Sequence, residues 1–400
     1  MSMAGEIPAV SGDTTWITCE PKAVRSLGVY IHYPFCVRKC AYCDFLSAPG
    51  DDAARKAYLE ALIREIRGQK SLFEESVIRS VFIGGGTPSL MEPDEFAELA
   101  SALRGTAGDW EADAEWTIEA NPGTVTQDKA RCWREQGVNR VSMGMQASQD
   151  RLLRRIGRIH VMEDVRQSVR ILREAGFDNL NLDLMMGLPD QSREDWQETL
   201  REALALEPTH LSCYSLIVED GTPLKNMVES GQMLLPDEDT EREMYADTIR
   251  ILDAAGYKQY EISNFAEPGR ESRHNLSYWD LSEYIGLGLG ASSYLDGRRI
   301  KNTSDLWQYI KEEHPERLAV VEETLNRQDR MSEWMFLGLR KTAGVSDTDF
   351  KEMFGQSFDE IYPEQIAKLL WDGLLERKAG RLCLTRRGLD LANIVFEAFV

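Results

Sequence analysis

Apolar and polar residues follow one another along the first half of the chain as short strand-like segments, each succeeded by a longer helix-like segment. The strand-like segments are nearly continuous apolar runs, as expected of parallel strands whose outer face is covered. Six such segments predict strands at residues 28–33, 80–84, 115–120, 139–144, 179–185 and 209–217.

Local signals mark where several of the intervening helices begin and end. Ser192 followed by Asp195 has the spacing of a capping box at the start of a helix. Asp237 is placed to cap the start of another helix, which the pattern ends at Gly256. Gly176 stands where a left-handed residue would close a third helix. Helices therefore alternate with the predicted strands.

Six strand–helix repeats predict an α/β fold built on a parallel sheet. Because a closed barrel needs eight repeats, the pattern predicts a partial, TIM-like (β/α)6 barrel with its chemistry at the carboxyl ends of the strands. Beyond about residue 219 the alternation fades. The glycine-rich run 286–290 lacks the βαβ unit of a dinucleotide-binding loop, so we expect a loop or tight bend there.

The end of the chain has a different pattern. Two helical runs, a short hairpin at 380–385 and a final helix at 389–400 predict a small helical, winged-helix-like domain. The predicted units are a leader at 1–27, the barrel at 28–256, a Tyr- and Gly-rich extension at 257–329 and the terminal domain at 330–400.

The amino-acid composition makes some classes of binding partner improbable. Acidic residues outnumber basic ones by 67 to 46, for a formal charge of -21, which disfavours nucleic acid and anionic membrane surfaces. No apolar run is long enough to span a membrane and the first residues lack a secretory pattern, so we expect a cytoplasmic protein. The seven cysteines are an odd number for a disulfide framework, which favours metal ligation in a reducing compartment.

Three of those cysteines, Cys36, Cys40 and Cys43, directly follow the first predicted strand. Thiolates suit iron–sulfur clusters and zinc. Three ligands without an evident fourth would leave one iron of a 4Fe–4S cluster open. Zinc would need a fourth ligand, for which His32 is a candidate, and ordinary core thiols are a further alternative. We expect the cluster.

A glycine-rich turn and three polar strand ends accompany the cysteines. Residues 84–88, Gly-Gly-Gly-Thr-Pro, would let the backbone approach a ligand closely, although an ordinary tight turn is the alternative. Glu119, Gln146 and Asp183 lie near strand ends in apolar surroundings, either as a satisfied core network or as contacts to a ligand. Their recurrence on successive strands favours one shared ligand, and Arg158 is placed to neutralise a carboxylate there.

The spacing Cys-x3-Cys-x2-Cys, with Tyr42 before the third cysteine, resembles the signature of the radical-SAM superfamily. The resemblance implies that a 4Fe–4S cluster on these cysteines binds S-adenosylmethionine at its open iron. It also implies that Tyr42 lies near the adenine and that the glycine turn holds the methionine ammonium.

From residue 28 to about 302, and again at 384–388, the chain resembles oxygen-independent coproporphyrinogen III oxidase and its relatives. This resemblance identifies no catalytic residue. It implies contacts to S-adenosylmethionine from Tyr30, Tyr42, Gly85, Gly86, Thr87, Glu119, Gln146, Arg158 and Asp183.

Two features of the sequence are closest to the HemW-type haem chaperones within that family. Where the oxidase carries a further cysteine, two places after the third, this chain has Phe45. The segment 273–279 resembles the chaperones' haem-binding motif and implies haem contacts from His274, Asn275, Tyr278 and Trp279. Neutral imidazole ligates haem iron well, although a structural histidine beside core aromatics is the alternative.

The resemblance therefore implies a haem chaperone that binds haem as cargo and delivers it to haemoproteins, respiratory ones among them. It further implies a 4Fe–4S cluster, S-adenosylmethionine and an electron donor such as flavodoxin or ferredoxin. The alternative is a radical-SAM oxidoreductase of porphyrin metabolism, such as the oxidative decarboxylase of coproporphyrinogen III. Phe45 and the motif around His274 favour the chaperone, and the sequence leaves open whether it also acts as an enzyme.

Overall fold

The computed structural model describes residues 25–400, so nearly all of the predicted leader at 1–27 lies outside the described residues. One twelve-stranded sheet organises the larger part of the chain, in the order β12-β11-β10-β9-β1-β2-β3-β4-β5-β6-β8-β7. Its central strands pair in parallel and in sequence order. These strands are β1 (Arg25–Tyr33), β2 (Ser76–Gly85), β3 (Asp109–Ala120), β4 (Arg140–Gln146), β5 (Leu180–Met186) and β6 (His210–Ser215).

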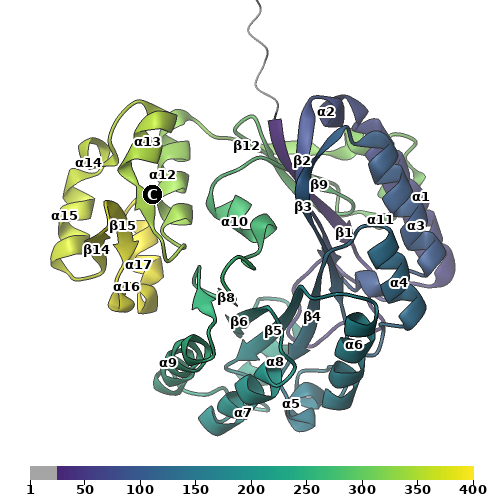
Figure 1. Cartoon of the computed structure of the whole chain (residues 1–400), viewed down its shortest axis with the longest axis horizontal. Helices are drawn as coiled ribbons and strands as arrows, with labels where there is room; N and C mark the ends of the chain where they lie inside the picture. Colours follow the sequence, from purple (N-terminus) through teal and green to yellow (C-terminus); the bar gives the residue numbers. More distant parts are fainter. Residues whose placement is uncertain (1–24) are drawn as a thin grey trace, which may run out of the picture.

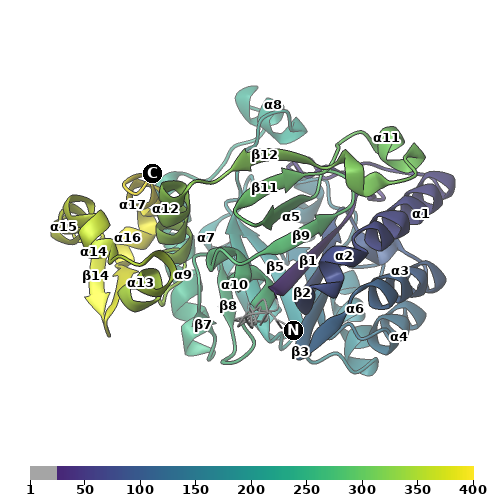
Figure 2. The same ribbon diagram turned by 90° about the horizontal axis from the view of Figure 1, so that it is seen from above.

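Helices connect these strands. The longer helices lie along the outer side of the curved sheet (Figure 1, Figure 2), whereas α8 (Pro223–Glu229) projects away from it at the mouth of the barrel, where the Leu224 amide donates to the Ala41 carbonyl at 2.9 Å. The connecting elements are α1 (Asp52–Gly68), α2 (Lys70–Glu74), η1 (Pro88–Leu90), α3 (Pro93–Thr106), α4 (Gln127–Glu135), α5 (Asp150–Arg155), α6 (Met162–Glu174), α7 (Arg193–Leu204), α8 (Pro223–Glu229) and α9 (Glu238–Ala254). The predicted partial (β/α)6 barrel is confirmed. No helix within residues 25–400 combines the length and apolar character needed to cross a membrane.

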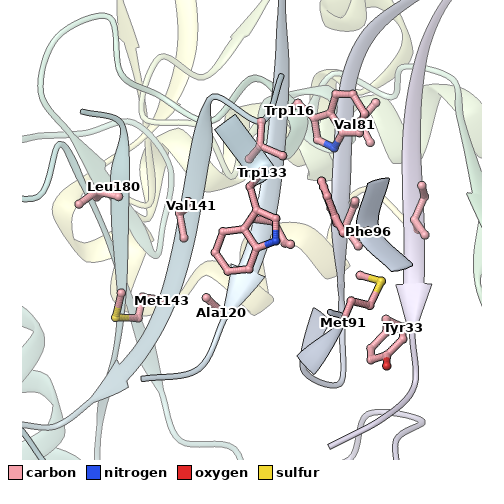
Figure 3. Close-up of a cluster of buried hydrophobic side chains, with 14 of the residues drawn as sticks. Tyr33, Val81, Met91, Phe96, Trp116, Ala120, Trp133, Val141, Met143 and Leu180 are labelled. Carbon is pink, nitrogen blue, oxygen red and sulfur yellow. The ribbon is translucent and has the colours of Figure 1, made fainter. Parts of the chain in front are cut away.

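The outward faces of the parallel strands are apolar because they pack against these helices. Val81, Trp116 and Val141 come from successive strands and share one buried cluster with Phe96 of α3 and Trp133 of α4 (Figure 3). The ring centroids of Phe96 and Trp133 lie 6.5 Å apart. Burial of one such large side chain stabilises the fold by about 2–3 kcal/mol. With the core on the outer side, the inward face of the strands is available for polar residues.

The structure confirms the predicted helix ends. At the start of α7 the Asp195 amide donates to Ser192 Oγ at 3.2 Å, and the Ser192 amide donates to the Asp195 carboxylate at 2.8 Å. At the start of α9 the Thr240 amide donates to Asp237 Oδ1 at 2.7 Å. Gly176 follows α6 with a φ of 86°, a left-handed conformation that glycine adopts at little cost.

The extension after α9 adds strands to both edges of the sheet. β8 pairs antiparallel with β6, whereas β9 pairs parallel to β1 and begins an antiparallel ribbon. The elements are β7 (Lys258–Gln259), β8 (Asn264–Ala266), α10 (Arg273–Trp279), β9 (Tyr284–Leu287), β10 (Ser292–Leu295), β11 (Arg298–Lys301), α11 (Leu306–Lys311), η2 (Pro315–Leu318) and β12 (Val320–Thr324).

The glycine-rich run 286–290 is only partly the loop or bend that the sequence predicts. Gly286 lies within β9, and the bend begins at Gly288, whose φ is 99°. A Cβ on Gly286 would lie 2.1 Å from the carbonyl oxygen of Ser292. Glycine at this position therefore permits a close approach of β9 and β10.

The terminal domain encloses its own hydrophobic core, which extends from Met331 to Phe399. A three-stranded sheet in the order β13-β15-β14 covers one side of it. The elements are α12 (Arg327–Gly338), β13 (Val345–Ser346), α13 (Asp347–Phe354), α14 (Phe358–Ile361), α15 (Pro363–Trp371), β14 (Leu375–Lys378), β15 (Arg381–Leu384), α16 (Arg386–Asp390) and α17 (Ala392–Glu397).

Two predicted boundaries in this domain are wrong. The hairpin consists of β14 and β15, so residues 380–385 contain only its second strand. Its turn lies at Ala379 and Gly380, which both have positive φ. The single helix expected at 389–400 is divided at Leu391, where φ is -120° and ψ is 30°, into α16 and α17.

Helix α10 lies between the barrel and the terminal domain and contacts both β2 and α12 (Figure 1). The Arg340 guanidinium lies 4.5 Å from the ring centroid of Trp279, close enough for a cation–π contact. Lys341 pairs with Asp280 just beyond the helix. A change in the position of α10 would therefore alter contacts with both the barrel and the terminal domain.

Candidate metal centre and cofactor site

A cavity of about 520 Å³ opens at the carboxyl ends of the parallel strands. Because parallel strands end at one edge of a sheet, side chains that are distant in sequence meet there. The predicted site residues that line the cavity are Cys36, Cys40, Tyr42, Cys43, Gly85, Gly86, Thr87, Glu119, Gln146, Arg158, Asp183 and Asn275. Tyr30, His274, Tyr278 and Trp279 do not line it.

The cysteine loop follows β1 and is held in place by hydrogen bonds. The Cys36 amide donates to the Ala48 carbonyl at 3.1 Å, and the Cys43 amide donates to the Cys40 carbonyl at 3.3 Å. All three cysteines are free and half-buried. Thr87 Oγ1 also donates to Cys36 Sγ at 3.5 Å, and such a donor favours the thiolate form that metal ligation requires.

His32 does not line the cavity that the three cysteines line, and both of its ring nitrogens form hydrogen bonds. Its Nε2 donates to the Leu46 carbonyl at 2.9 Å, and its Nδ1 accepts from the Tyr30 hydroxyl at 2.9 Å. Burial lowers the pKa of His32, which agrees with a neutral ring. Within residues 25–400, no three His, Cys, Asp or Glu side chains are placed to hold a single metal ion. The donor set therefore fits an iron–sulfur cluster with one open iron better than zinc.

Tyr30 and Tyr42 occupy different places relative to the cavity. Tyr30 stacks on Phe82, with ring centroids 6.4 Å apart, and reaches the cysteine loop only through His32. Tyr42 lies on the cavity wall against a small apolar cluster that includes Leu152. Burial raises the pKa of Tyr42, so its hydroxyl is protonated.

The glycine turn after β2 packs directly against the cysteine loop. The Gly86 amide donates to the Tyr33 carbonyl and the Thr87 amide to the Phe35 carbonyl, each at 2.7 Å. A Cβ on Gly86 would lie 2.6 Å from the Phe35 carbonyl oxygen. Gly85 has a φ of 105°, which a side chain would strain. These glycines therefore hold the turn against the loop as well as exposing backbone to the cavity.

Two carboxyl groups face the cavity from neighbouring parts of the sheet. Glu119 Oε2 accepts from the Gly85 amide at 3.1 Å. Burial, together with the charge of Asp183, raises the pKa of Glu119 to about 8. Asp183 accepts from Asn181 Nδ2 at 2.8 Å and from Ser142 Oγ at 3.2 Å, and burial raises its pKa. A cationic ligand would favour the ionised form of both groups.

The sequence suggested that Arg158 neutralises a carboxylate; within residues 25–400 it forms no ion pair with Glu119, Asp183 or any other group. Its Nη2 donates to Asn121 Oδ1 at 2.9 Å and to the Gly144 carbonyl at 2.6 Å. Its Nη1 donates to Cys40 Sγ at 3.7 Å. Gln146 ends β4 beside this group with a φ of 64°, a strained conformation that occurs often at functional sites.

The predicted haem motif lies on α10, at the border of the cavity. His274 is buried, its Nδ1 2.9 Å from Ser80 Oγ and its Nε2 2.9 Å from the Tyr278 hydroxyl. The ring stacks on Phe82 at 5.2 Å. Burial lowers the pKa of His274 to about 3, so the imidazole is neutral. Of the motif, only Asn275 reaches the cavity wall.

Several polar residues on the inward face of the strands were missed by the sequence analysis. They line the cavity below the predicted residues and are Arg140, Ser142, Asn181 and Ser212. Arg140, Ser142 and Gly144 alternate along β4 with the outward-facing apolar residues. A polar residue at every second position of a fully buried strand was the signal that could have found them.

Comparisons with known proteins agree with this geometry. The family model described as the radical SAM superfamily matches residues 30–203, and the HemN C-terminal domain matches residues 325–391. The solved coproporphyrinogen III oxidase HemN from Escherichia coli superposes with a TM-score of 0.80 over 94% of this chain and 90% of its own. Its 24% identity supports a shared fold only.

Curated relatives match over nearly their whole length. The heme chaperone HemW of Lactococcus lactis is 40% identical over 93% of this chain and 96% of its own. The HemW of Bacillus subtilis is 39% identical over 93% and 98%, and that of Escherichia coli is 34% identical over 94% and 98%. The resemblance proposed from the sequence is thus confirmed, and the chain belongs to the HemW family of the radical SAM superfamily.

Proposed function

We propose that this protein is a haem chaperone that binds haem as cargo and delivers it to haemoproteins, respiratory ones among them. The observation that carries the proposal is the 40% identity with a heme chaperone HemW over 93% of the chain. Phe45 supports it, because this cavity-lining residue occupies the place of a cysteine in the related oxidase. A cytoplasmic location and an electron donor such as flavodoxin or ferredoxin are parts of the same proposal.

We assign a 4Fe–4S cluster to the thiolates of Cys36, Cys40 and Cys43. The chemistry that such a cluster supplies is one-electron reduction of the sulfonium of S-adenosylmethionine. Thr87 and Arg158 donate to two of the three sulfurs, which stabilises their negative charge. The fourth coordination position is left to the cofactor.

The cavity wall has groups that match S-adenosylmethionine. Glu119 and Asp183 would favour its cationic groups, and Gly85 and Gly86 expose backbone without a Cβ. Tyr30 would act indirectly. Its hydroxyl donates to the ring of His32, which in turn donates to the Leu46 carbonyl and so helps to position the cysteine loop. The remaining assigned residues are Tyr42, Thr87, Gln146 and Arg158.

We assign haem binding to the α10 segment with His274, Asn275, Tyr278 and Trp279. For His274 to ligate iron, one ring nitrogen must exchange a hydroxyl partner for the metal. Each such hydrogen bond contributes about 0.5–1.5 kcal/mol, which a metal–imidazole bond would outweigh. Trp279 of the same segment contacts Arg340 of the terminal domain, so a haem held by α10 would lie next to that domain.

The predicted units acquire roles in this proposal. Residues 28–256 would hold the cluster and S-adenosylmethionine, and residues 257–329 would hold the haem motif. Residues 330–400 would contact that motif through α10. The contacts of α10 with both β2 and α12 support this division.

The test uses the full chain, reconstituted with iron and sulfide without oxygen. We expect stoichiometric haem binding and faster delivery to an apo-cytochrome than from free haem. No haem binding would refute the proposal. Conversion of coproporphyrinogen III to protoporphyrinogen IX, in the presence of reductant and S-adenosylmethionine, would instead establish the oxidoreductase.

A further inference from the structure

Arg140 is a charged side chain in the interior of the barrel whose role is not explained by the cluster or by the assigned cofactor contacts. It is the first residue of β4 and only 1% exposed, yet it lines the cavity. Six strand positions separate it from Gln146 at the mouth, a rise of about 20 Å. Arg140 therefore marks the inner end of the cavity, away from the cysteine loop.

The guanidinium of Arg140 has few partners. Its Nη1 donates to Thr117 Oγ1 at 3.5 Å, a long contact, and its Nε has no acceptor. Among residues 25–400 no carboxylate forms an ion pair with it. A buried arginine normally has a carboxylate partner, because an isolated charge is costly to remove from water.

The titratable neighbours of Arg140 include two histidines and two carboxyl groups. Burial and then the charge of Arg140 lower the pKa of His210. For His274, burial is the main cause of a lowered pKa and the charge of Arg140 also contributes. Burial raises the pKa of both Glu119 and Asp183, and the charge of Arg140 partly opposes that rise. Neither carboxyl group lies within ion-pair distance of Arg140. The guanidinium of Arg140 therefore keeps hydrogen-bonding capacity that no carboxylate among the described residues takes up.

The surroundings of Arg140 are polar, and two of its neighbours, Ser142 and Asn181, donate to Asp183. Ser142, Asn181, Ser212 and Asn275 line the cavity together with Arg140 and come from β4, β5, β6 and α10. Asn275 belongs to the segment to which haem binding is assigned above. An anionic group beside Arg140 would therefore lie next to that segment.

We propose that Arg140 is the binding site for a carboxylate of the ligand that occupies the inner end of this cavity. A guanidinium fits a carboxylate through two parallel hydrogen bonds. Resting on the proposed function, we identify that carboxylate as a haem propionate. The haem would then be held by Arg140 at one edge and by the α10 segment at its iron.

A second explanation is that Arg140 serves only as a distant counter-charge for Glu119 and Asp183. The two explanations differ in which ligand binds more weakly when the charge of Arg140 is removed. If Arg140 is only a counter-charge, its removal would weaken the binding of S-adenosylmethionine, and haem and its dimethyl ester would bind equally well. A carboxylate site would distinguish haem from its dimethyl ester.

The experiment titrates haem and haem dimethyl ester into the reconstituted full chain, following the Soret absorbance. It compares the natural protein with R140M, R140K and R201M, where Arg201 is an exposed residue of α7. We expect the natural protein and R201M to bind haem at least about tenfold more tightly than the ester, as a charged hydrogen-bonded pair would give. R140M should bind haem and ester equally, and R140K should be intermediate.

The controls separate the possible failures. R140M should melt no lower than the natural protein, because the change removes an unpaired buried charge, and circular dichroism checks its fold. Equal binding of haem and ester by the natural protein overturns the carboxylate site, even if R140M is misfolded. The carboxylate site is also overturned if R140M binds S-adenosylmethionine more weakly but still binds haem much more tightly than the ester. Absence of haem binding by every variant refutes the proposed function and, with it, the propionate assignment.

Discussion

Arg158 Nη1 donates to Cys40 Sγ at 3.7 Å, joining residues that are 118 positions apart in the chain. The same guanidinium is anchored by Asn121 and by the Gly144 carbonyl. Its charge is therefore held against one of the three proposed cluster ligands. Positive charge and hydrogen bonds at a ligating sulfur raise the reduction potential of an iron–sulfur cluster.

R158Q should lower the reduction potential of the reconstituted cluster. The loss of about 1.4 kcal/mol of charge-assisted bonding corresponds to about 60 mV for a one-electron couple. A redox titration monitored by electron paramagnetic resonance measures the shift. R154Q, on the exposed side of α5, should leave the potential unchanged. An equal potential in both variants would mean that Arg158 does not act on the cluster.

C36A, C40A and C43A should each abolish the cluster, because each removes one of three thiolate ligands. Iron and acid-labile sulfide are measured after anaerobic reconstitution. C132A is the matched control, since Cys132 lies outside the cavity and its Sγ donates to the Pro93 carbonyl at 3.2 Å. Retention of iron and sulfide by any of the three variants would contradict the ligand assignment.

E119Q should flatten the pH dependence of stability of the cofactor-free protein. Burial raises the pKa of Glu119 to about 8 from a reference of 4.5, so the folded state binds the proton more tightly than the unfolded state. Its contribution is therefore full below about pH 4.5 and is lost as the pH rises through 8. Urea unfolding at pH 6 and pH 8 measures the difference.

The control for this comparison is E135Q, a change of an exposed glutamate on α4. The natural protein and E135Q should both lose stability between pH 6 and pH 8, whereas E119Q should lose less. An identical slope in all three proteins would show that the Glu119 carboxyl is ionised across this range.

Y278F should tighten haem binding several-fold, whereas H274A should weaken it. Removal of the Tyr278 hydroxyl leaves the buried Nε2 of His274 without its partner, which costs the haem-free protein about 1–3 kcal/mol. Ligation of iron would restore that partner. Haem titration of both variants and the natural protein measures the effect. Weaker binding by Y278F would point to Tyr278 itself as the ligand.

Local features of this protein followed from neighbouring residues alone. The capping box at Ser192 and Asp195, the left-handed Gly176 and the spacing of the three cysteines all involve residues a few positions apart. Their geometry depends on short-range sterics and hydrogen bonds, so the sequence was sufficient to place them. The repetition of strand and helix also determined the parallel sheet, since βαβ units leave few other arrangements.

Only the tertiary structure decided how distant side chains meet. It placed Arg158 on Cys40 instead of on a carboxylate and turned Tyr30 toward His32. It enclosed His274 between Ser80 and Tyr278, and left Arg140 at the inner end of the cavity. The physical reason is that these contacts depend on strand register and on which residues the interior can exclude from water, and neither is encoded within a single local segment.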